Sequence, residues 1–390
     1  MGRAKVVVRV HRRCAVRVGF SAGMRQRGEG RIVPARPGMT SSMQGRLPAP
    51  DPAGQAEVPV APGCPVSVVT SVMNEQLHLA EAVRHMLAQD YSGRIEIVIA
   101  LGPSKDRTDE IAAELAAADD RVHLVRNPSP AGATPCGLNA AIAAGQSPVV
   151  ARIDGHAMLP PDYLRIAVDV LAKSGADNVG GIMAAEGGTR FERAVARAMT
   201  SRLGVGNASF HTGGAAGRAD TVYLGVFRRA AIVRVGGYDE HFLRAQDWEM
   251  NLRIRRTGGT VWFTPQLRVK YRPRSSARAL ARQYFHYGRW RRVVMRRHEG
   301  TASLRYLAPP AVLVGLLVGS VAAAAGFRPA LVLPAGYLGL VTVGGIVEGA
   351  GLPAAVRVRL PLVLAIMHLS WGAGFLTSPR RLARSSSTAG

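Results

Sequence analysis

Asp154 and His156 follow a short apolar run and could bind a metal ion. The run, residues 149–153, is rich in β-branched side chains and predicts a buried strand of a parallel sheet. Because ligands of open α/β sheets bind beyond the carboxyl ends of the strands, we expect both side chains to face a site. Carboxylate oxygen and imidazole nitrogen are both ligands of divalent cations. The alternative is that the Asp-Gly pair only forms a turn that ends the strand.

Asp247 is a second residue that could do chemistry. It lies at the start of a helix predicted over residues 248–257, where the helix dipole favours negative charge, so it could be a simple capping acid. However, it adjoins Trp248 and a cluster of arginines, surroundings that can tune a carboxylate for work as a general base. The preceding segment carries glycine, aromatic and amide residues, namely Gly236, Gly237, Tyr238 and Gln246.

An alternation of strands and helices must position these residues. Four strands are predicted, at 66–72, 95–101, 121–126 and 149–153. Helices are predicted between them, at 76–89, from residue 108 and at 137–145. This β-α-β-α-β-α-β order implies an α/β fold with a parallel sheet and right-handed crossovers.

The chain beyond the fourth strand is predicted to complete the same domain. Helices are expected at 163–171, 230–235 and 248–257, and strands at 178–183, 221–227 and 261–264, with extended chain to 271. Residues 184–219 are rich in Gly, Ala and Arg and fit no regular pattern, so we expect a mobile loop over the site. A basic helix interleaved with aromatic residues is predicted at 276–297.

The net charge of +24 comes almost entirely from arginine. Much of the charge lies in residues 1–46 and 268–305, and the second segment adjoins an apolar region. Anionic lipid headgroups explain this arrangement better than nucleic acid, which would need the charge on one folded surface. We therefore expect a membrane partner and no nucleic acid. The three cysteines, Cys14, Cys64 and Cys136, form neither a disulfide framework nor a metal-binding pattern, which suits a reducing cytoplasm.

Three stretches near the C-terminus predict membrane helices. No charged residue occurs between Arg305 and Arg328, in residues 329–347 or in residues 360–378, and each stretch is close to the ~20 residues that cross a bilayer. The arginine-rich segment 282–305 should be cytoplasmic, which places the preceding domain inside the cell. Three spans would leave the C-terminal arginines outside against the same rule, so either the rule is overridden or one segment is re-entrant.

The chain therefore divides into five predicted segments. Residues 1–62 are rich in Arg, Gly and Pro, show neither a signal peptide nor a span, and are expected to be disordered; translation could also start at Met39 or Met43. The following segments are the α/β domain at 63–275, a basic amphipathic helix at 276–305, two to three membrane helices at 306–378 and a disordered tail at 379–390.

Six motifs in a fixed order, within residues 66–292, resemble those of family 2 glycosyltransferases. They are Asn74-Glu75, Gln89-Asp90-Tyr91, Leu138-Asn139 in a Gly-rich helix, Asp154-Gly155-His156 in the place of an Asp-x-Asp motif, Gly236-Gly237-Tyr238-Asp239-Glu240, and Gln246-Asp247. The run at 220–229 and the Asp-Gly-His variant are similar to the succinoglycan-type exopolysaccharide glucosyltransferases. The resemblance implies a GT-A fold, Rossmann-like, with a mostly parallel sheet and helices on both faces.

The resemblance also implies a role for each motif. Asp247 would be the general base of an inverting transfer, and Mg²⁺ or Mn²⁺ held by Asp154, with His156 assisting, would neutralise charge on the departing diphosphate. The residues implied to bind the nucleotide sugar are Asn74, Glu75, Asp106, Asn139 and Asp154. The residues implied to bind the acceptor are Gly236, Gly237, Tyr238, Gln246, Arg289 and Trp290.

Two departures from the family pattern affect these roles. Relatives carry Asp-Asp-Gly-Ser after the second strand, whereas residues 100–104 here contain no carboxylate. Asp106 could substitute for it, or could cap the following helix. His156 replaces a metal-binding aspartate, so we expect weaker metal affinity that is lost below pH ~6.5. The Arg289-Trp290 pair is similar to the family's Arg-Trp motif with a longer spacing from its glutamine, and its helix could equally lie on a membrane surface.

The expected function is the transfer of a single sugar to a lipid-linked or polysaccharide acceptor at the cytoplasmic face of the cytoplasmic membrane, with polysaccharide-assembly proteins as partners. One alternative is a processive polysaccharide synthase, which usually has more spans on both sides of the catalytic domain. Another is a catalytically silent membrane protein that binds sugar nucleotides or anionic lipid, in keeping with the missing carboxylates at 100–101.

Overall fold

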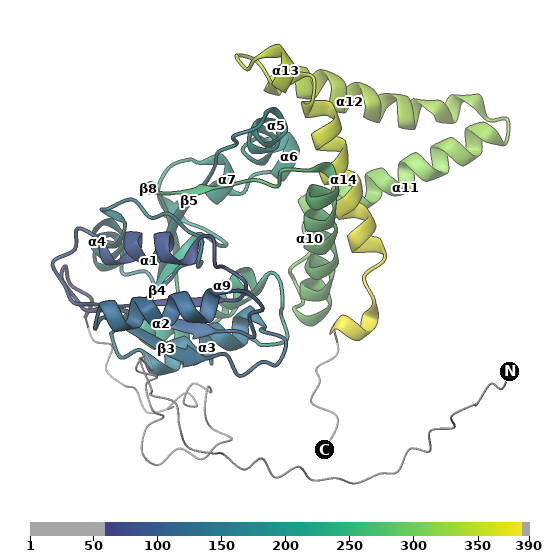
Figure 1. Cartoon of the computed structure of the whole chain (residues 1–390). Helices are drawn as coiled ribbons and strands as arrows, with labels where there is room; N and C mark the ends of the chain where they lie inside the picture. The colour runs from purple at the N-terminus through teal and green to yellow at the C-terminus, as the bar shows by residue number, and fades with distance from the viewer. Residues whose placement is uncertain (1–58, 384–390) are drawn as a thin grey trace, which may run out of the picture.

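An eight-stranded mixed sheet forms the centre of the protein. The computed structural model describes residues 59–383, so most of the two segments predicted to be disordered lies outside the described residues. The strand order is β3-β2-β1-β4-β7-β5-β8-β6. Helices cover both faces of the sheet, and the C-terminal helices form a separate group at one side (Figure 1).

The first four strands are parallel, as the sequence predicted. They are β1 (Val66–Val72), β2 (Ile95–Leu101), β3 (Val122–Arg126) and β4 (Val149–Arg152). The helices between them are α1 (Leu79–Leu87), α2 (Thr108–Ala118) and α3 (Thr134–Ala144). Successive side chains of a strand point to opposite faces, so Ile97 and Ile99 join the core that includes α1 and α2, whereas Val98 joins the core that includes α3. β4 lies inside the sheet, so the residues after it lie at the middle of the carboxyl edge.

The remaining strands make the sheet mixed. They are β5 (Asn178–Ala185), β6 (Gly217–Arg218), β7 (Tyr223–Arg228) and β8 (Val261–Tyr271). β7 lies between β4 and β5 and is antiparallel to both, whereas β8 is parallel to β5. The helices of this half are α4 (Tyr163–Ser174), α8 (Arg229–Arg234) and α9 (Gln246–Arg256). The antiparallel β7 brings α8 and the loop that leads to α9 back to the same side as α3.

Residues 184–219, for which we expected a loop, contain three helices. They are α5 (Arg190–Met199), α6 (Arg202–Val205) and α7 (Ser209–Thr212). α5 begins at a capping box, in which the Thr189 hydroxyl accepts from the Glu192 N–H and the Glu192 carboxylate accepts from the Thr189 N–H. The small apolar side chains of α5 pack against α14. The loop prediction was wrong: the sequence carries a capping box, and apolar residues recur at helical spacing from Phe191 to Met199.

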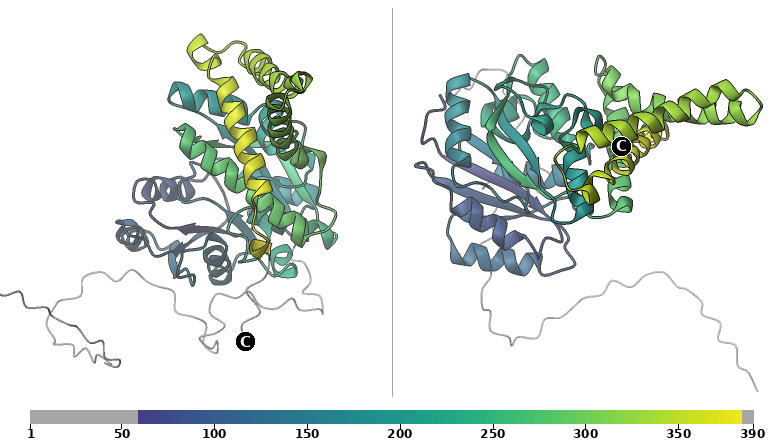
Figure 2. Two further views of the ribbon diagram at one scale, coloured as in Figure 1. Left: turned by 90° about the vertical axis from the view of Figure 1, so that its right-hand side faces the viewer. Right: turned by 90° about the horizontal axis from the view of Figure 1, so that it is seen from above.

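The C-terminal helices include three segments that could cross a membrane. The helices are α10 (Ala277–Arg297), α11 (Leu304–Ala324), α12 (Val332–Glu348), α13 (Ala354–Arg357) and α14 (Leu360–Leu376), with short 3-10 turns η1 (Arg328–Leu331) and η2 (Arg380–Ala383). By length and composition, the candidate spans are Leu304–Ala324, Arg328–Glu348 and Ala354–Leu376. α11 and α12 form a hairpin that projects away from the sheet (Figure 2).

α10 and α14 pack closely against each other. A Cβ atom built on Gly288 would lie 1.9 Å from the carbonyl oxygen of Trp371, and one built on Gly374 would lie 1.9 Å from that of Phe285. Only glycine allows the two backbones to approach this closely. α10 lies between the sheet domain and α14 (Figure 1), so it joins the sheet domain to the apolar helices.

Candidate active site

The carboxyl edge of β1 and β4 positions Asp154. The Ile153 N–H donates to the Val69 carbonyl at 3.0 Å, which extends the pairing of the two strands by one residue before the chain turns. At Gly155 an added Cβ would lie 2.5 Å from a methyl group of Val72, so the turn passes too close to β1 for a larger residue. The Asp154 side chain is 25% exposed. It therefore lies at the place where open α/β sheets bind ligands.

Arg152, the last residue of β4, joins Asp154 to Asp247. Its Nη2 atom lies 2.8 Å from Asp154 Oδ1, and its Nη1 atom lies 3.5 Å from Asp247 Oδ2. Burial alone would lower the pKa of Arg152, but the two carboxylates raise this pKa above its ordinary value. A fixed positive charge therefore lies between two acidic side chains that are far apart in the sequence.

Asp247 lies in the first turn of α9, next to a strained residue. Ala245, directly before the helix, has a φ of 62°, a left-handed conformation that is unfavourable for a residue with a Cβ atom. Although 35% of the Asp247 side chain is exposed, its partial burial raises the pKa of this carboxyl group. Arg152 opposes this rise in pKa, Asp154 adds to it, and a hydrogen bond from Tyr238 opposes it. A carboxyl group with a raised pKa is suited to accept a proton.

The Gly-Gly-Tyr loop places Tyr238 against Asp247. Gly236 and Gly237 have φ values of 73° and 74°, so the chain makes two successive left-handed steps that favour glycine. Tyr238 is buried, and its hydroxyl donates to Asp247 Oδ1 at 3.3 Å. Asn139 of α3 fixes this loop: its Nδ2 donates to the Tyr238 carbonyl at 2.9 Å, and its Oδ1 accepts from the Tyr238 N–H at 2.9 Å. Asn139 is thus engaged within the protein, and its predicted contact with the nucleotide sugar stays a prediction.

His156 and Glu75 form a pair at the same edge. His156 Nδ1 lies 3.0 Å from Glu75 Oε1, and this hydrogen bond raises the pKa of His156 despite partial burial. The structure thus brings together three of the predicted donor- and metal-binding residues, Glu75, Asp154 and His156.

Asn74 and Asp106 organise the neighbouring loops. Asn74 is left-handed, with a φ of 57°, and its Oδ1 accepts from the Lys105 N–H at 2.8 Å. Asp106 accepts from the Thr108 N–H at 3.1 Å and from the Gln76 N–H at 3.2 Å. Asp106 therefore holds the turn directly before α2, whose N-cap position is Arg107 rather than Asp106, and its predicted nucleotide contact stays a prediction.

The side chains near Asp154 provide only some of the ligands that a hard divalent cation needs. Within residues 59–383 no group of three or more His, Cys, Asp and Glu side chains is arranged to hold a metal ion. Mg²⁺ and Mn²⁺ do not require such a group, because they are commonly bound by one or two carboxylates together with substrate phosphates. Asp154 Oδ2 is not used by Arg152 and could serve as such a ligand. His156 could serve only in its neutral form.

Three further residues were predicted to bind the acceptor, namely Gln246, Arg289 and Trp290. Gln246 begins α9, directly before Asp247. Trp290 of α10 is buried against Phe242, with ring centroids 6.1 Å apart, and Arg289 lies over Phe285, 4.8 Å from its centroid. Among the described contacts neither Arg289 nor Trp290 reaches Asp154 or Asp247, so their role in acceptor binding stays a prediction.

Sequence reasoning missed Arg152, the residue that joins the two acids. The signal was present, because a charged residue within an otherwise apolar strand must have a partner when it is buried.

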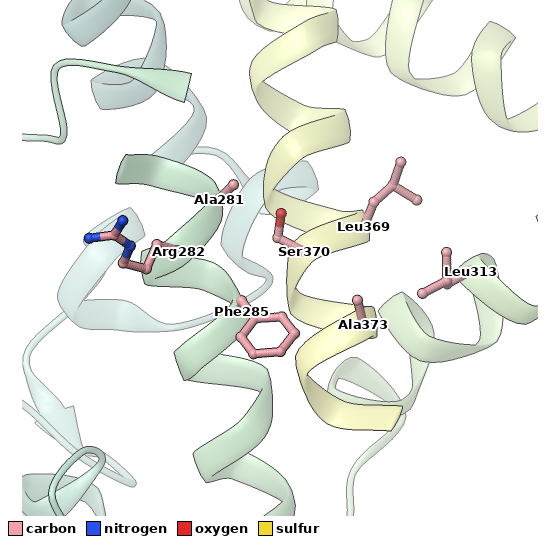
Figure 3. A pocket seen from close by; sticks show the side chains of 7 residues that line it. All are labelled: Ala281, Arg282, Phe285, Leu313, Leu369, Ser370 and Ala373. Carbon is pink, nitrogen blue, oxygen red and sulfur yellow. The ribbon is translucent and has the colours of Figure 1, made fainter. Parts of the chain in front are cut away.

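An apolar groove of about 480 Å³ between α10, α11 and α14 was also not predicted. It is lined by Ala281, Arg282, Phe285, Leu313, Leu369, Ser370 and Ala373 (Figure 3). None of its lining residues is a predicted site residue, so the groove belongs to the apolar helices rather than to the acidic centre.

Comparison with known proteins identifies the family. Residues 67–234 match the model of glycosyl transferase family 2. The chain is 31% identical over 309 residues to the succinoglycan biosynthesis protein ExoA of Rhizobium meliloti, an alignment that covers 79% of this chain and 93% of that protein. The chain belongs to glycosyl transferase family 2. The predicted resemblance is thereby confirmed, and this protein is a glycosyltransferase.

A solved structure supports the fold of this family 2 glycosyltransferase. The mannosyltransferase PcManGT from Pyrobaculum calidifontis, determined in complex with GDP-Man and Mn²⁺, superposes with a TM-score of 0.55 at 19% sequence identity. The match covers 83% of this chain and 89% of that one. The predicted GT-A fold followed by apolar helices is confirmed.

Proposed function

We propose that this glycosyltransferase is anchored in the cytoplasmic membrane and moves a single sugar, with inversion, from a nucleotide sugar to a lipid-linked or polysaccharide acceptor at the cytoplasmic face. The observation that carries the proposal is the arrangement of Asp154 and Asp247 around Arg152, with distances of 2.8 and 3.5 Å. The three apolar helices after α10 support a site at a membrane surface. The similarity to ExoA supports an acceptor of exopolysaccharide assembly.

In the proposed reaction Asp247 acts as the general base. Its carboxylate takes the proton of an acceptor hydroxyl while that oxygen bonds to the anomeric carbon of the donor. The bond from this carbon to the diphosphate breaks, and the nucleoside diphosphate leaves with the bonding electrons. A single displacement of this kind inverts the anomeric configuration. The raised pKa of Asp247 makes its carboxylate a better proton acceptor than an ordinary aspartate.

The neighbouring residues orient the base and would hold the metal ion. Tyr238 and Arg152 hold the Asp247 carboxylate by a hydrogen bond and an ion pair, so that it keeps one orientation. Asp154 would hold Mg²⁺ or Mn²⁺, which supplies positive charge to the departing diphosphate when it is bound. The mannosyltransferase that shares this fold was solved with Mn²⁺, which supports a metal of this type.

Nucleoside diphosphate release tests the proposal. The full chain in nanodiscs would first be screened by thermal shift against UDP-, GDP- and dTDP-sugars with Mn²⁺, because a true donor stabilises the folded state in proportion to its occupancy. With the donor so identified, and with lipid-linked sugars extracted from membranes as acceptors, Asp247→Asn should release diphosphate at least ~100-fold more slowly than wild type.

Asp162→Asn is a matched control, because 45% of the Asp162 side chain is exposed and it pairs only loosely with Arg165 at 3.7 Å. It should leave the rate unchanged. Equal rates of wild type and Asp247→Asn above background would remove Asp247 as the base. Retention of the donor's configuration in the product would contradict the single displacement.

A further inference from the structure

Arg291 lies in an aromatic sandwich next to the proposed base. Its guanidinium carbon is 4.2 Å from the centroid of Trp248, the neighbour of Asp247 in α9, and 4.1 Å from that of Tyr306 in the first turn of α11. Among the described residues it makes neither an ion pair nor a hydrogen bond. Burial lowers the pKa of Arg291 to about 10, so the group is still charged at neutral pH.

Two further arginines surround the same place and share one carboxylate. Arg255 lies 3.4 Å and Arg305 lies 3.8 Å from Asp220, and both distances exceed those of close ion pairs. The charge of Arg305 lowers the pKa of Arg291, and the charge of Asp220 raises it. Three guanidinium groups thus face one carboxylate, which leaves an excess of positive charge. Asp220 is 60% exposed, so the cluster opens to solvent on one side.

The cluster contains N–H groups that lack acceptors. Trp248 Nε1, Arg255 Nε and Arg291 Nη1 are buried without a hydrogen-bond partner within residues 59–383. A buried donor without an acceptor is costly, so several in one place indicate that an acceptor is bound there in the working state. Positive charge and unused N–H groups together match the oxygens of a phosphate or diphosphate group.

The position of the cluster indicates which phosphate this is. Arg305 and Tyr306 begin the first candidate membrane span, and Trp248 follows the proposed base. A lipid that carries its phosphate at the bilayer surface would place it at this level, with its sugar directed toward α9. A free nucleotide would instead be expected at the carboxyl edge of the sheet, near Asp154.

We propose that Arg255, Arg291 and Arg305 form a binding site for the phosphate or diphosphate group of a lipid-linked acceptor. This inference rests on the proposed function, because it names the acceptor class of that reaction. The phosphate would take the place of Asp220 as the partner of the arginines and would supply acceptors to the buried N–H groups.

The test measures binding of farnesyl diphosphate to the full chain in phosphatidylcholine nanodiscs, by calorimetry. Farnesol and inorganic pyrophosphate serve as probes that lack the phosphates or the chain. Arg291→Gln and Arg305→Gln should each weaken farnesyl diphosphate binding by about 10- to 100-fold, the effect of losing one hydrogen bond to a charged group. Arg278→Gln, an exposed arginine of the same basic helix, should leave the affinity unchanged.

Each possible result decides the matter. The site is supported if farnesyl diphosphate binds at least ~10-fold more tightly than both other probes, and if only the cluster variants lose this preference. It is refuted if pyrophosphate binds equally well, if phosphatidylglycerol displaces the probe, or if Arg278→Gln acts like the cluster variants. Arg305 lies over Tyr306, 4.6 Å from its centroid, but not between the two rings. Arg305→Gln therefore decides the matter even if Arg291→Gln fails to fold. The assay needs neither donor nor Asp247, so its failure is distinguishable from failure of the proposed transfer.

Discussion

Asp154 and Asp247 contact different terminal nitrogens of Arg152: Nη2 lies 2.8 Å from Asp154, and Nη1 lies 3.5 Å from Asp247. The positive charge allows two carboxylates to occupy one site without forcing either to be neutral. Because one arginine cannot neutralise both, the centre keeps a net negative charge that suits a divalent cation. This relationship ties the end of β4 to the start of α9.

Replacing Arg152 with glutamine should damage both stability and transfer. The Arg152 side chain is only 9% exposed, and breaking a buried ion pair costs about 3–5 kcal/mol of unfolding free energy. We expect a loss at the lower end of that range, measured by chemical denaturation, because Asp247 is partly exposed. Arg165→Gln, which removes only exposed ion pairs, should change the free energy of unfolding by less than about 1 kcal/mol. Similar losses in both variants would contradict a buried charge centre.

The pH dependence of transfer should reflect the raised pKa of Asp247. Since the base works only when ionised, the acid limb of kcat/KM should lie above the ordinary aspartate value of 3.8. The Tyr238 hydroxyl lowers the pKa of Asp247 by donating to its carboxylate. Tyr238→Phe should therefore move the acid limb to higher pH, as measured from initial rates over a pH series. A limb that stays in place, or moves down, would argue against Asp247 as the titrating base.

Asn139→Ala should destabilise the protein. The substitution leaves the N–H and the carbonyl of Tyr238 without their partners, and each buried unsatisfied group costs about 1–3 kcal/mol. We expect the free energy of unfolding to fall by about 2–4 kcal/mol, measured in urea. If Asn139 instead only contacts the nucleotide sugar, the donor KM would rise and the unfolding curve would not move.

Gly374→Ala should separate α10 from α14. The new methyl group would lie 1.9 Å from the Phe285 carbonyl oxygen, so one backbone must move. Overpacking of this kind typically costs about 1–3 kcal/mol, and we expect a lower melting temperature in nanodiscs. Gly315→Ala in α11 is the matched control, because an added Cβ there meets no atom within 4 Å. Equal melting temperatures of the two variants would show that the contact between α10 and α14 is not tight.

Local patterns in the sequence predicted most of the fold. The apolar β-branched runs of β1, β2 and β4 and the uncharged C-terminal stretches were located within a few residues, because periodicity and composition encode such elements directly. α5 did carry a local signal, a capping box followed by apolar residues at helical spacing, but the Gly-, Ala- and Arg-rich composition of residues 184–219 favoured a loop.

The sequence predicted which residues form the site, but not which of them contact one another. Motif order pointed to Asp154 and Asp247, yet nothing local showed that Arg152 joins them or that Asn139 holds the Tyr238 backbone. Arg152 and Asp247, like Asn139 and Tyr238, are far apart in the chain. A single sequence shows that a buried arginine needs a partner but not which distant residue supplies it. The same limit hid the arginine cluster, which α9, α10 and α11 form together.

A double-mutant cycle tests most directly whether the two acids work in one site. Nucleoside diphosphate release would be measured for wild type, Asp154→Asn, Asp247→Asn and the double variant, each confirmed as folded by its melting curve. If both acids serve one transition state, the double variant should be about as slow as the slower single variant, because residues that act as a unit are strongly non-additive. Logarithmic rate losses that simply add in the double variant would contradict a shared site.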